Sequence, residues 1–263
     1  MKMTSIIARQ ICSDRKLHNA ARFYYIMRMR DGGRLSTRVN LTRDKSHFRG
    51  FSPYQIKSYF EILVERGWCR TDGKGNFFFA SIGQISATYG CPNSCQAVEV
   101  PEGIVESSVQ FRNFASAVVI GALAKSMYYF NNSKESTNEH TSERGRLAGN
   151  ELSQELSLEL IRNYLFNVSW GTAQNVRRWA VQSGLVTKQD KYKALKNNRH
   201  AQIKMTWEEV LAYKESLHPD DAAKVTLRNG HCCVQCASWV TLDSSLLKRA
   251  KFNHGARIGV HVD

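Results

Sequence analysis

Acidic residues, prolines and long apolar runs are all scarce in this sequence. Asp and Glu number 23 against 37 Lys and Arg, which gives a formal net charge of +14 and favours a polyanionic partner. With only four prolines and 42% hydrophobic residues, a proline-rich disordered chain is excluded. The most apolar run, residues 117–124, is far shorter than the ~20 residues that span a bilayer, so no membrane partner is expected.

The sequence also lacks the common catalytic motifs. It contains no Gly-x-x-x-x-Gly-Lys-Ser/Thr phosphate loop, no Gly-x-Ser-x-Gly elbow and no His-Glu-x-x-His pair. His254 and His261 are too far apart to form the His-x-His metal pair of a nuclease. We therefore expect no enzyme activity, no cofactor and no small-molecule substrate.

Cysteines are few and odd in number, and residues 1–13 lack the apolar core of a secretory leader. Seven cysteines in such a chain favour a reducing, cytoplasmic environment. Cys91, Cys95, Cys233 and Cys236 could together hold zinc through four thiolates, but 137 residues separate the two pairs. Free buried cysteines are the alternative that we favour, so no metal site is predicted.

Positive charge is concentrated in two segments. Residues 1–85 hold 16 basic and 6 acidic residues, net +10, and residues 150–204 hold 9 and 4, net +5. The segments 86–149 and 205–263 are nearly neutral. Each of the two basic segments is therefore a candidate contact for a polyanion.

Residues 52–81, SPYQIKSYFEILVERGWCRTDGKGNFFFAS, predict a helix followed at once by a β-hairpin. Ser52 can cap the first free N–H groups, and Pro53 suits the first helical position. Gly67 is typical of a residue that ends a helix, and the glycines of DGKG suit a tight turn between two strands. The apolar helix face consists of Ile56, Tyr59, Phe60 and Leu63.

A similar unit begins 117 residues later. Ser169 would cap a helix that Gly184 ends, and both copies span fifteen residues from serine to glycine. The segment 185–195, LVTKQDKYKAL, is a candidate second ribbon. The apolar face of this helix consists of Ala173, Val176 and Ala180.

Further helices are expected elsewhere in the chain, and residues 131–146 are expected to form a polar, mobile loop. A capping box, TWEE, opens one of these helices at residue 206. The further helices are expected at residues 21–30, 122–130, 150–166, 206–217, from 218 onward and 243–252.

Aromatic runs at Tyr24-Tyr25 and at residues 77–79 admit two interpretations. Such rings could stack on single-stranded bases. The period-2 alternation of a strand instead favours burial of Phe77 and Phe79 with Phe78 exposed, and we favour the core for both runs.

With these units the chain resembles the winged helix-turn-helix superfamily, as a tandem pair over about residues 17–82 and 111–195. The resemblance rests on the cap, the apolar face, the glycine and the ribbon. It implies a mainly α fold with small β-hairpin wings. The implied parts are winged helix domain 1 (1–85), a linker (86–110), winged helix domain 2 (111–204) and a C-terminal helical segment (205–263).

In this superfamily the helix before the wing lies in the major groove, so its outward side chains are the candidate base readers. Arginine can pair with guanine, and asparagine or glutamine with adenine. Glu61 and Glu65 would repel phosphates, so only the first turn of the first helix should touch DNA. The predicted base readers are Thr172, Gln174, Asn175 and Arg178 in the second helix and Tyr54, Gln55, Lys57 and Ser58 in the first.

Contacts to the DNA backbone position a protein without reading sequence, and basic or hydroxyl side chains supply them. The predicted backbone contacts are Arg28, Arg30, Arg34, Arg38, Arg43, Lys45, Arg49, Lys74, Ser169, Arg177, Lys188 and Lys191.

The sequence thus predicts a protein that binds double-stranded DNA specifically, as a transcription regulator or origin binder of a phage or mobile element. Tandem winged helices of this size are similar to plasmid or phage replication initiators, and that role stays open as an alternative. A second alternative is a protein-interaction or virion-associated protein without specific DNA binding. A homo-oligomer is compatible with all three.

Overall fold

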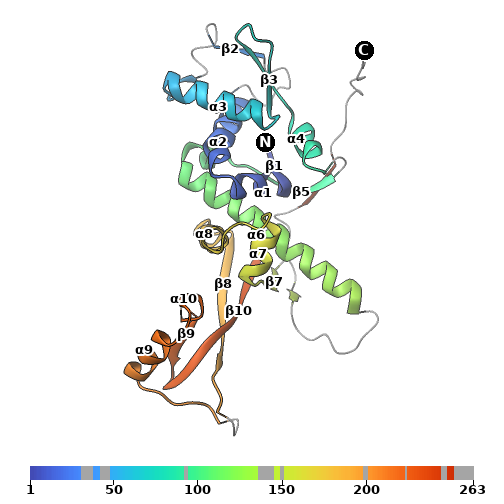
Figure 1. Ribbon diagram of the computed structural model, residues 1–263. Coiled ribbons are helices and arrows are strands. Elements are labelled where there is room, and N and C mark those ends of the chain that lie inside the picture. Colours follow the sequence, from blue (N-terminus) through green and yellow to red (C-terminus); the bar gives the residue numbers. More distant parts are fainter. Residues whose placement is uncertain are drawn as a thin grey trace.

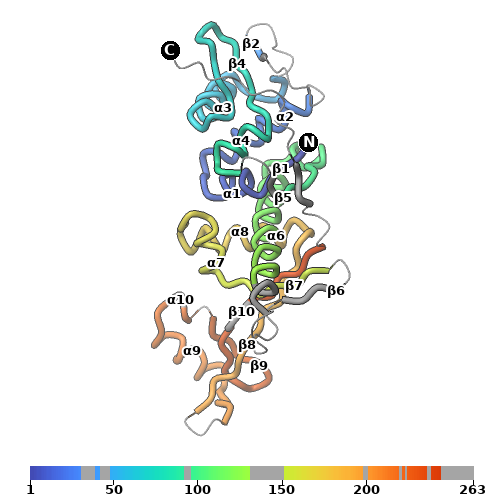
Figure 2. Tube along the Cα trace, turned by 90° about the vertical axis from the view of Figure 1, so that its right-hand side faces the viewer, coloured from blue at the N-terminus to red at the C-terminus, as the bar shows by residue number. Residues whose placement is uncertain are grey.

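The protein forms an elongated molecule in which two halves lie end to end along one long helix, α6 (Ser108–Glu135) (Figure 1). Figure 2 shows the same order from the side, with the N-terminal half above and the C-terminal half below. The computed structural model describes residues 1–30, 38–41, 48–91, 94–135, 145–148, 151–197, 201–222, 224–243 and 248–251.

The first half alternates short strands with helices. Its elements in chain order are β1 (Lys2–Thr4), α1 (Ser5–Ser13), α2 (Arg15–Arg30), β2 (Arg38–Asn40), α3 (Pro53–Glu65), β3 (Cys69–Thr71), β4 (Asn76–Phe79), α4 (Ile82–Thr88), β5 (Ser94–Glu99) and α5 (Glu102–Glu106).

The second half begins with α6 and contains the longest strands. Its further elements are β6 (Gly145–Ala148), β7 (Glu151–Glu155), α7 (Leu158–Tyr164), α8 (Trp170–Gln182), β8 (Val186–Ala194), α9 (Trp207–Glu215), α10 (Pro219–Ala222), β9 (Val225–Arg228) and β10 (His231–Asp243). The last strand, β11 (Lys248–Lys251), returns to the first half, where it pairs with β5.

The expected fold class, mainly α with small hairpin wings, is wrong. The described strands form one five-stranded sheet and two three-stranded sheets, all with antiparallel pairing, so the fold is a mixture of helices and sheets. The large sheet has the order β6-β7-β10-β8, with β9 paired to β10, and the small sheets have the orders β2-β4-β3 and β1-β5-β11.

One arrangement recurs in both halves. In the first, α3 precedes β3 and β4, and β4 lies between β2 and β3. In the second, α8 precedes β8 and β10, and β10 lies between β7 and β8. The halves differ in what joins the last two strands: a tight turn links β3 to β4, whereas α9, α10 and β9 lie between β8 and β10 in the chain and at the far end of that ribbon in space (Figure 1).

Local capping signals led to correct helix starts. Ser52 accepts a hydrogen bond from the Gln55 N–H at 3.2 Å, and a full capping box opens α3. Ser169 caps α8 by accepting the Thr172 N–H, and a second full capping box, with Thr206, opens α9. Gly67 and Gly184 follow their helices with φ angles of +71° and +75°, a backbone that other residues adopt at a cost.

Residues 150–166 do not form the single helix that was expected. Leu152, Gln154 and Leu156 are buried while their neighbours are more exposed, which is the period-2 pattern of a strand. This segment is β7, which pairs with β10, and Ser157 then caps the separate helix α7. The four-residue spacing of the leucines was therefore misleading.

The segments expected to be a mobile loop and a helical C-terminal part also differ. Helix α6 continues to Glu135 and β6 covers residues 145–148, while residues 136–144 lie outside the described residues. In the C-terminal segment α9 and α10 are helical, but β10 is a central strand of the large sheet and β11 replaces the helix expected at 243–252.

One apolar cluster runs through both halves. It includes Met3 and Tyr25 in the first half and Val176 and Leu242 in the second, all with less than a tenth of their surface exposed. Tyr24 and Tyr25 are fully buried, so these two rings belong to the core as expected. The unit around α9 has a small cluster of its own, built from Val210, Val225 and Cys232.

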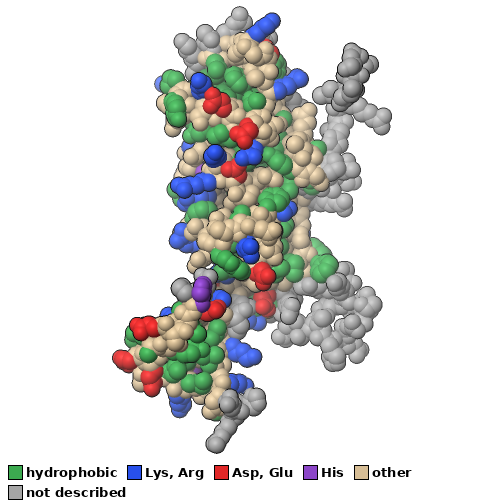
Figure 3. All heavy atoms as spheres, viewed as in Figure 1, with side chains coloured by type: hydrophobic (Ala, Val, Ile, Leu, Met, Phe, Trp, Pro, Cys, Tyr) green, Lys and Arg blue, Asp and Glu red, His purple; other side chains and the backbone are tan. Residues whose placement is uncertain are grey.

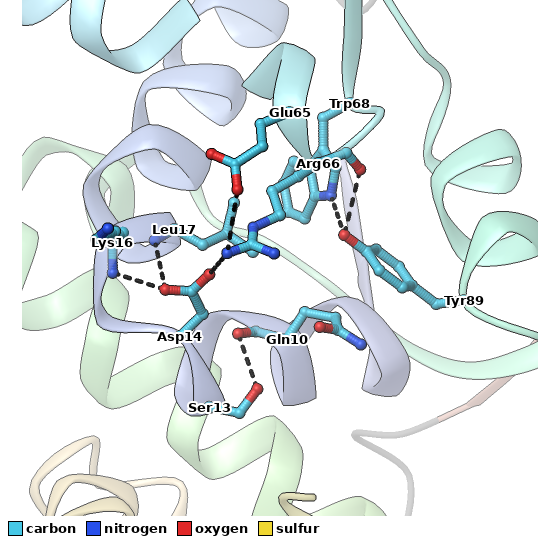
Figure 4. A network of polar contacts seen from close by, with 9 residues as sticks. All are labelled: Gln10, Ser13, Asp14, Lys16, Leu17, Glu65, Arg66, Trp68 and Tyr89. Atoms are coloured by element: carbon cyan, nitrogen blue, oxygen red, sulfur yellow. Dashed lines mark hydrogen bonds and ion pairs between the residues drawn. The ribbon is translucent and has the colours of Figure 1, made fainter. Parts of the chain in front are cut away.

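The C-terminal end of α3 is tied to the junction of α1 and α2 by polar contacts (Figure 4). The Arg66 guanidinium lies 2.7 Å from the Asp14 carboxylate, which also accepts the Lys16 N–H at 2.9 Å. The Trp68 indole N–H donates to the Tyr89 hydroxyl at 3.1 Å, and that hydroxyl donates to the Arg66 carbonyl at 3.3 Å. These contacts tie the end of α3 both to the junction of α1 and α2 and to the end of α4.

Candidate nucleic-acid interface

Helix α8 is amphipathic and presents one continuous outer stripe. Ala173, Val176 and Ala180 are buried against the rest of the second half. On the opposite side, Gln174 and Arg178 are exposed, one turn apart. Two of the predicted base readers therefore lie on an accessible face of a rigid element.

The other two predicted base readers of α8 have partners within the helix. The Asn175 side-chain oxygen accepts a hydrogen bond from the Arg178 guanidinium at 2.9 Å. Thr172 is half-buried at the helix start, where its hydroxyl lies 2.9 Å from that of Ser169. Asn175 thus orients Arg178, while Ser169 and Thr172 belong mainly to the cap.

Arg177 faces the sheet rather than solvent. Its guanidinium donates to the Ser238 hydroxyl at 2.9 Å, and that hydroxyl donates to the Asp190 carboxylate at 2.6 Å. Burial lowers the pKa of Arg177, and the charge of Asp190 partly offsets this shift. Arg177 therefore does not make the predicted contact with the DNA backbone. Its hydrogen bond to Ser238 instead docks α8 on β8 and β10.

Strand β8 carries exposed lysines, but two of them have partners. The Lys188 ammonium lies 2.8 Å from the Asp190 carboxylate. The Lys191 ammonium lies 4.1 Å from the centroid of the Trp239 ring. Among the described strands β8 pairs with β10 alone, and lysines on such a sheet edge disfavour pairing with other chains.

The Asp190→Asn variant is expected to lose stability at neutral pH. Burial alone would raise the pKa of Asp190, but hydrogen bonds from Lys188 and Ser238 and nearby positive charge lower it below its usual value. A hydrogen bond to a charged group contributes about 1.5–3 kcal/mol, so we expect a loss of that order in urea unfolding at neutral pH. This stabilisation by Asp190 is present above the unfolded-state pKa of about 3.9. It is lost as the pH falls through the lower folded-state pKa.

The difference between wild type and Asp190→Asn should therefore shrink on acidification. Asp221→Asn is the matched control, because Asp221 is exposed and its ion-pair partner, Lys224, is exposed as well. A difference that stayed constant down to acid pH would contradict the assigned role of Asp190.

In the first half, the first turn of α3 is the exposed part of the predicted reader. Tyr54 is 81% exposed, more than the other large hydrophobic side chains of the described residues. Lys57 is also exposed. Gln55 is exposed but its side-chain oxygen accepts the Ser52 N–H at 2.9 Å, and Ser58 is half-buried. Glu61 and Glu65 are exposed further along, as the sequence predicted.

The predicted backbone contacts of the first half fall into three groups. Arg28 is only 4% exposed and belongs to the core of α2, so it cannot contact DNA without rearrangement. Arg30, Arg49 and Lys74 are exposed, and the Arg30 guanidinium donates to the Arg49 carbonyl at 3.0 Å. The contacts predicted for Arg34, Arg43, Lys45 and the Arg38 side chain lie outside what the structure describes.

Arg30 and Arg49 also line an open cavity of about 460 Å³ between α2, α5 and the turn before α3. Arg22 lies in the same wall, with its guanidinium donating to the Val105 carbonyl at 2.6 Å. Glu102 and Glu106 also line the cavity, so it is of mixed charge.

Charge is unevenly distributed over the surface in Figure 3. Lys and Arg side chains occur along the left edge of the upper part, where α3 and α8 lie in the same view of Figure 1. On the unit that carries α9, acidic side chains lie on the left of a hydrophobic patch, and Lys and Arg side chains lie to its right and below it. The two ends of the molecule therefore suit different contacts.

The cysteines give little support to a zinc site. Cys91 is disulfide-bonded, and Cys233 is a free, buried thiol. Across the described part of the chain, no group of three or more His, Cys, Asp or Glu side chains is placed to hold a metal ion. A helix of sufficient length and hydropathy to cross a bilayer is also missing from the described residues.

Sequence reasoning missed two exposed aromatic residues beside α8. Trp170, the first residue of α8, is 46% exposed, and Phe166, in the turn before it, is 48% exposed. The sequence did carry one signal: Trp170 directly follows the capping Ser169, a position at the start of a helix where a large apolar side chain is unlike the polar residues around it.

Comparison with protein-family models, with curated proteins and with solved structures finds no match to this chain.

Proposed function

We propose that the protein binds double-stranded DNA sequence-specifically, with α8 as the main reading helix and the first turn of α3 as a second contact. The observation that carries the proposal is the outer stripe of α8, where Gln174 and Arg178 are exposed and Asn175 orients the arginine. An α-helix of this kind fits the major groove, and these side chains match the hydrogen-bonding edges of adenine and guanine.

Two further observations support the proposal. Each half repeats a helix followed by two antiparallel strands, an order that resembles winged helix-turn-helix proteins, in which the helix reads and the strands contact the backbone. The net charge of +14 would bring such a protein to DNA and add affinity that does not depend on sequence.

The biological role that we infer is transcription regulation or origin binding for a phage or mobile element, with replication initiation as the alternative. This role implies action in the cytoplasm. Homo-oligomerisation would fit either role, because paired sites on DNA commonly match paired proteins.

A protein-interaction role is the second candidate, and α9 favours it. Trp207 and Leu211 are 48% and 42% exposed at a spacing of one helical turn, and exposed Glu208 and Glu215 flank them. Acidic side chains disfavour DNA at this end of the molecule. If this role were the whole function, α8 would show no base preference.

The test is selection of bound fragments from a random duplex pool, followed by salt titration. We expect a defined motif bound at least about 10³-fold more tightly than random duplex. We also expect an affinity that falls with salt by roughly 0.9 log units per log unit of salt for each phosphate neutralised. Absence of any enriched motif, with only weak binding to all duplexes, would reject the proposal in favour of protein interaction.

A further inference from the structure

The turn between α7 and α8 exposes two large aromatic rings where small polar residues are usual. Phe166 is 48% exposed and Trp170 is 46% exposed, and neither belongs to the buried core. Trp170, Gln174 and Arg178 follow one another at intervals of four residues, so the tryptophan extends the outer stripe of α8 toward its N-terminal end.

The backbone of this turn makes phenylalanine an unfavourable residue at position 166. Phe166 and Asn167 have φ angles of +64° and +58°, and the Phe166 N–H donates to the Asn163 carbonyl at 3.2 Å. The Asn167 N–H donates to the Arg162 carbonyl at 3.0 Å, which completes the helix-ending motif that normally carries glycine at the position of Phe166. A phenylalanine there has a steric cost. Because its ring is not fully buried, burial does not offset that cost.

Each ring has an arginine beside it. The Arg9 guanidinium, from α1, lies 3.7 Å from the Phe166 ring centroid and 4.8 Å from that of Tyr164. The Arg162 guanidinium lies 5.2 Å from the Trp170 ring centroid, and its Nε donates to the Val168 carbonyl at 3.1 Å. These contacts leave about half of each aromatic side chain accessible and add two positive charges next to them.

Each ring thus has a guanidinium over it and is still about half exposed, and a partly exposed aromatic ring beside positive charge is a surface that an unpaired nucleobase can bind. Every base offers a π-face for stacking, and the arginines are placed to attract the adjacent phosphates. A fully paired duplex hides its base faces inside the stack, so only unstacked bases could use these rings.

We propose that Phe166 and Trp170, with Arg9 and Arg162, form a stacking ledge for unpaired DNA bases next to the groove contacted by α8. The inference rests on the proposed function for its location on DNA. It adds that the protein opens or unstacks the duplex beside its site instead of only reading it.

The first test compares the affinity of the protein for the selected duplex with that for the same duplex containing an unpaired bubble beside the site. By fluorescence anisotropy, the full-length wild type should prefer the bubble. The double variant Phe166→Gly, Trp170→Ala should lose about 5- to 150-fold of its affinity for the bubble for each stacked base, and less for the paired duplex.

A second readout follows the bases themselves. A 2-aminopurine placed beside the site brightens when it is unstacked, and quenching by Trp170 would indicate that it stacks again on the protein. Wild type should change this fluorescence on binding, and the double variant should not. Equal affinity of the wild type for bubble and paired duplex, with unchanged 2-aminopurine fluorescence, would overturn the ledge.

The variants are chosen so that loss of folding does not imitate the expected result. Glycine suits the left-handed backbone at position 166, so Phe166→Gly should keep the wild-type melting curve. Trp207→Ala is the matched control, because Trp207 is also the first residue of a capped helix and is 48% exposed. Equal effects of Trp207→Ala and Trp170→Ala would also reject the ledge.

The proposed function and the ledge can fail separately. If the wild type enriches no duplex motif yet binds a labelled thymidine oligomer through Phe166 and Trp170, the ledge stands and specific duplex reading fails. If a motif is enriched and the double variant binds the bubble as well as wild type does, duplex reading stands and the ledge fails.

Discussion

The Arg178→Ala variant is expected to bind the selected duplex about 5- to 150-fold more weakly than wild type, because a bidentate contact with guanine is worth ~1–3 kcal/mol of discrimination. The loss should be confined to sequences that carry the preferred base opposite Arg178. Binding to random duplex should change little, and the measurement is a pair of titrations at one salt concentration.

The free protein already holds Arg178 in position. Its guanidinium is exposed on α8 and donates to the Asn175 side chain at 2.9 Å, so part of the cost of ordering a long side chain is met before DNA binds. Asn175→Ala should therefore also weaken binding to the preferred sequence, because it removes the base contact of Asn175 and leaves Arg178 less ordered.

Two control variants separate base reading from simple charge. Arg178→Lys keeps the positive charge but loses the planar fork, so it should lose base preference while keeping the salt dependence. Lys74 lies at the exposed tip between β3 and β4, and Lys74→Ala should weaken binding to all sequences by the same factor. If Arg178→Ala left the selected motif unchanged, α8 would not be the reading helix.

The parts of the fold that the sequence predicted correctly are those decided by neighbouring residues. Ser52, Ser169 and Thr206 start helices because each side chain accepts a backbone N–H three residues further on. The hairpin after Gly67 likewise depends on residues of its own turn, where Gly73 and Gly75 take positive φ angles and Asp72 accepts the Lys74 N–H.

The parts that were predicted wrongly are decided by contacts distant in the chain. Whether residues 151–155 form a strand depends on β10, which begins at His231, and nothing in the local pattern reveals that partner. The same holds for β8, which looked like half of a short ribbon but pairs with a strand some forty residues later. Tertiary pairing overrides helical spacing in such segments.

The candidate site follows the same division. The outer side of α8 could be predicted from helical periodicity, and Gln174 and Arg178 are exposed as expected. Burial of Arg28 and the turn of Arg177 toward Ser238 depend on packing between elements, which a list of basic residues does not contain. Charge clustering alone therefore overestimates how many arginines are available to DNA.

The largest expected effect on stability is that of Phe60→Ala, which should lower the free energy of unfolding by about 3–5 kcal/mol. Phe60 is 1% exposed and joins α3 to α2 and β4. Its ring is stacked 3.9 Å from that of Phe77, and it meets the Phe23 ring edge-on at 5.3 Å. Alanine would leave a cavity among aromatic rings that are too constrained to close it.

Tyr54→Ala is the matched control for this measurement, because Tyr54 lies on the same helix but is 81% exposed. Urea unfolding should place Tyr54→Ala within about 0.5 kcal/mol of wild type, as for ordinary surface substitutions. Tyr54→Ala should nevertheless weaken DNA binding, although its helix stays folded. A loss below about 1 kcal/mol for Phe60→Ala would mean that α3 is not docked through this aromatic cluster, and its first turn would then have no rigid support for reading DNA.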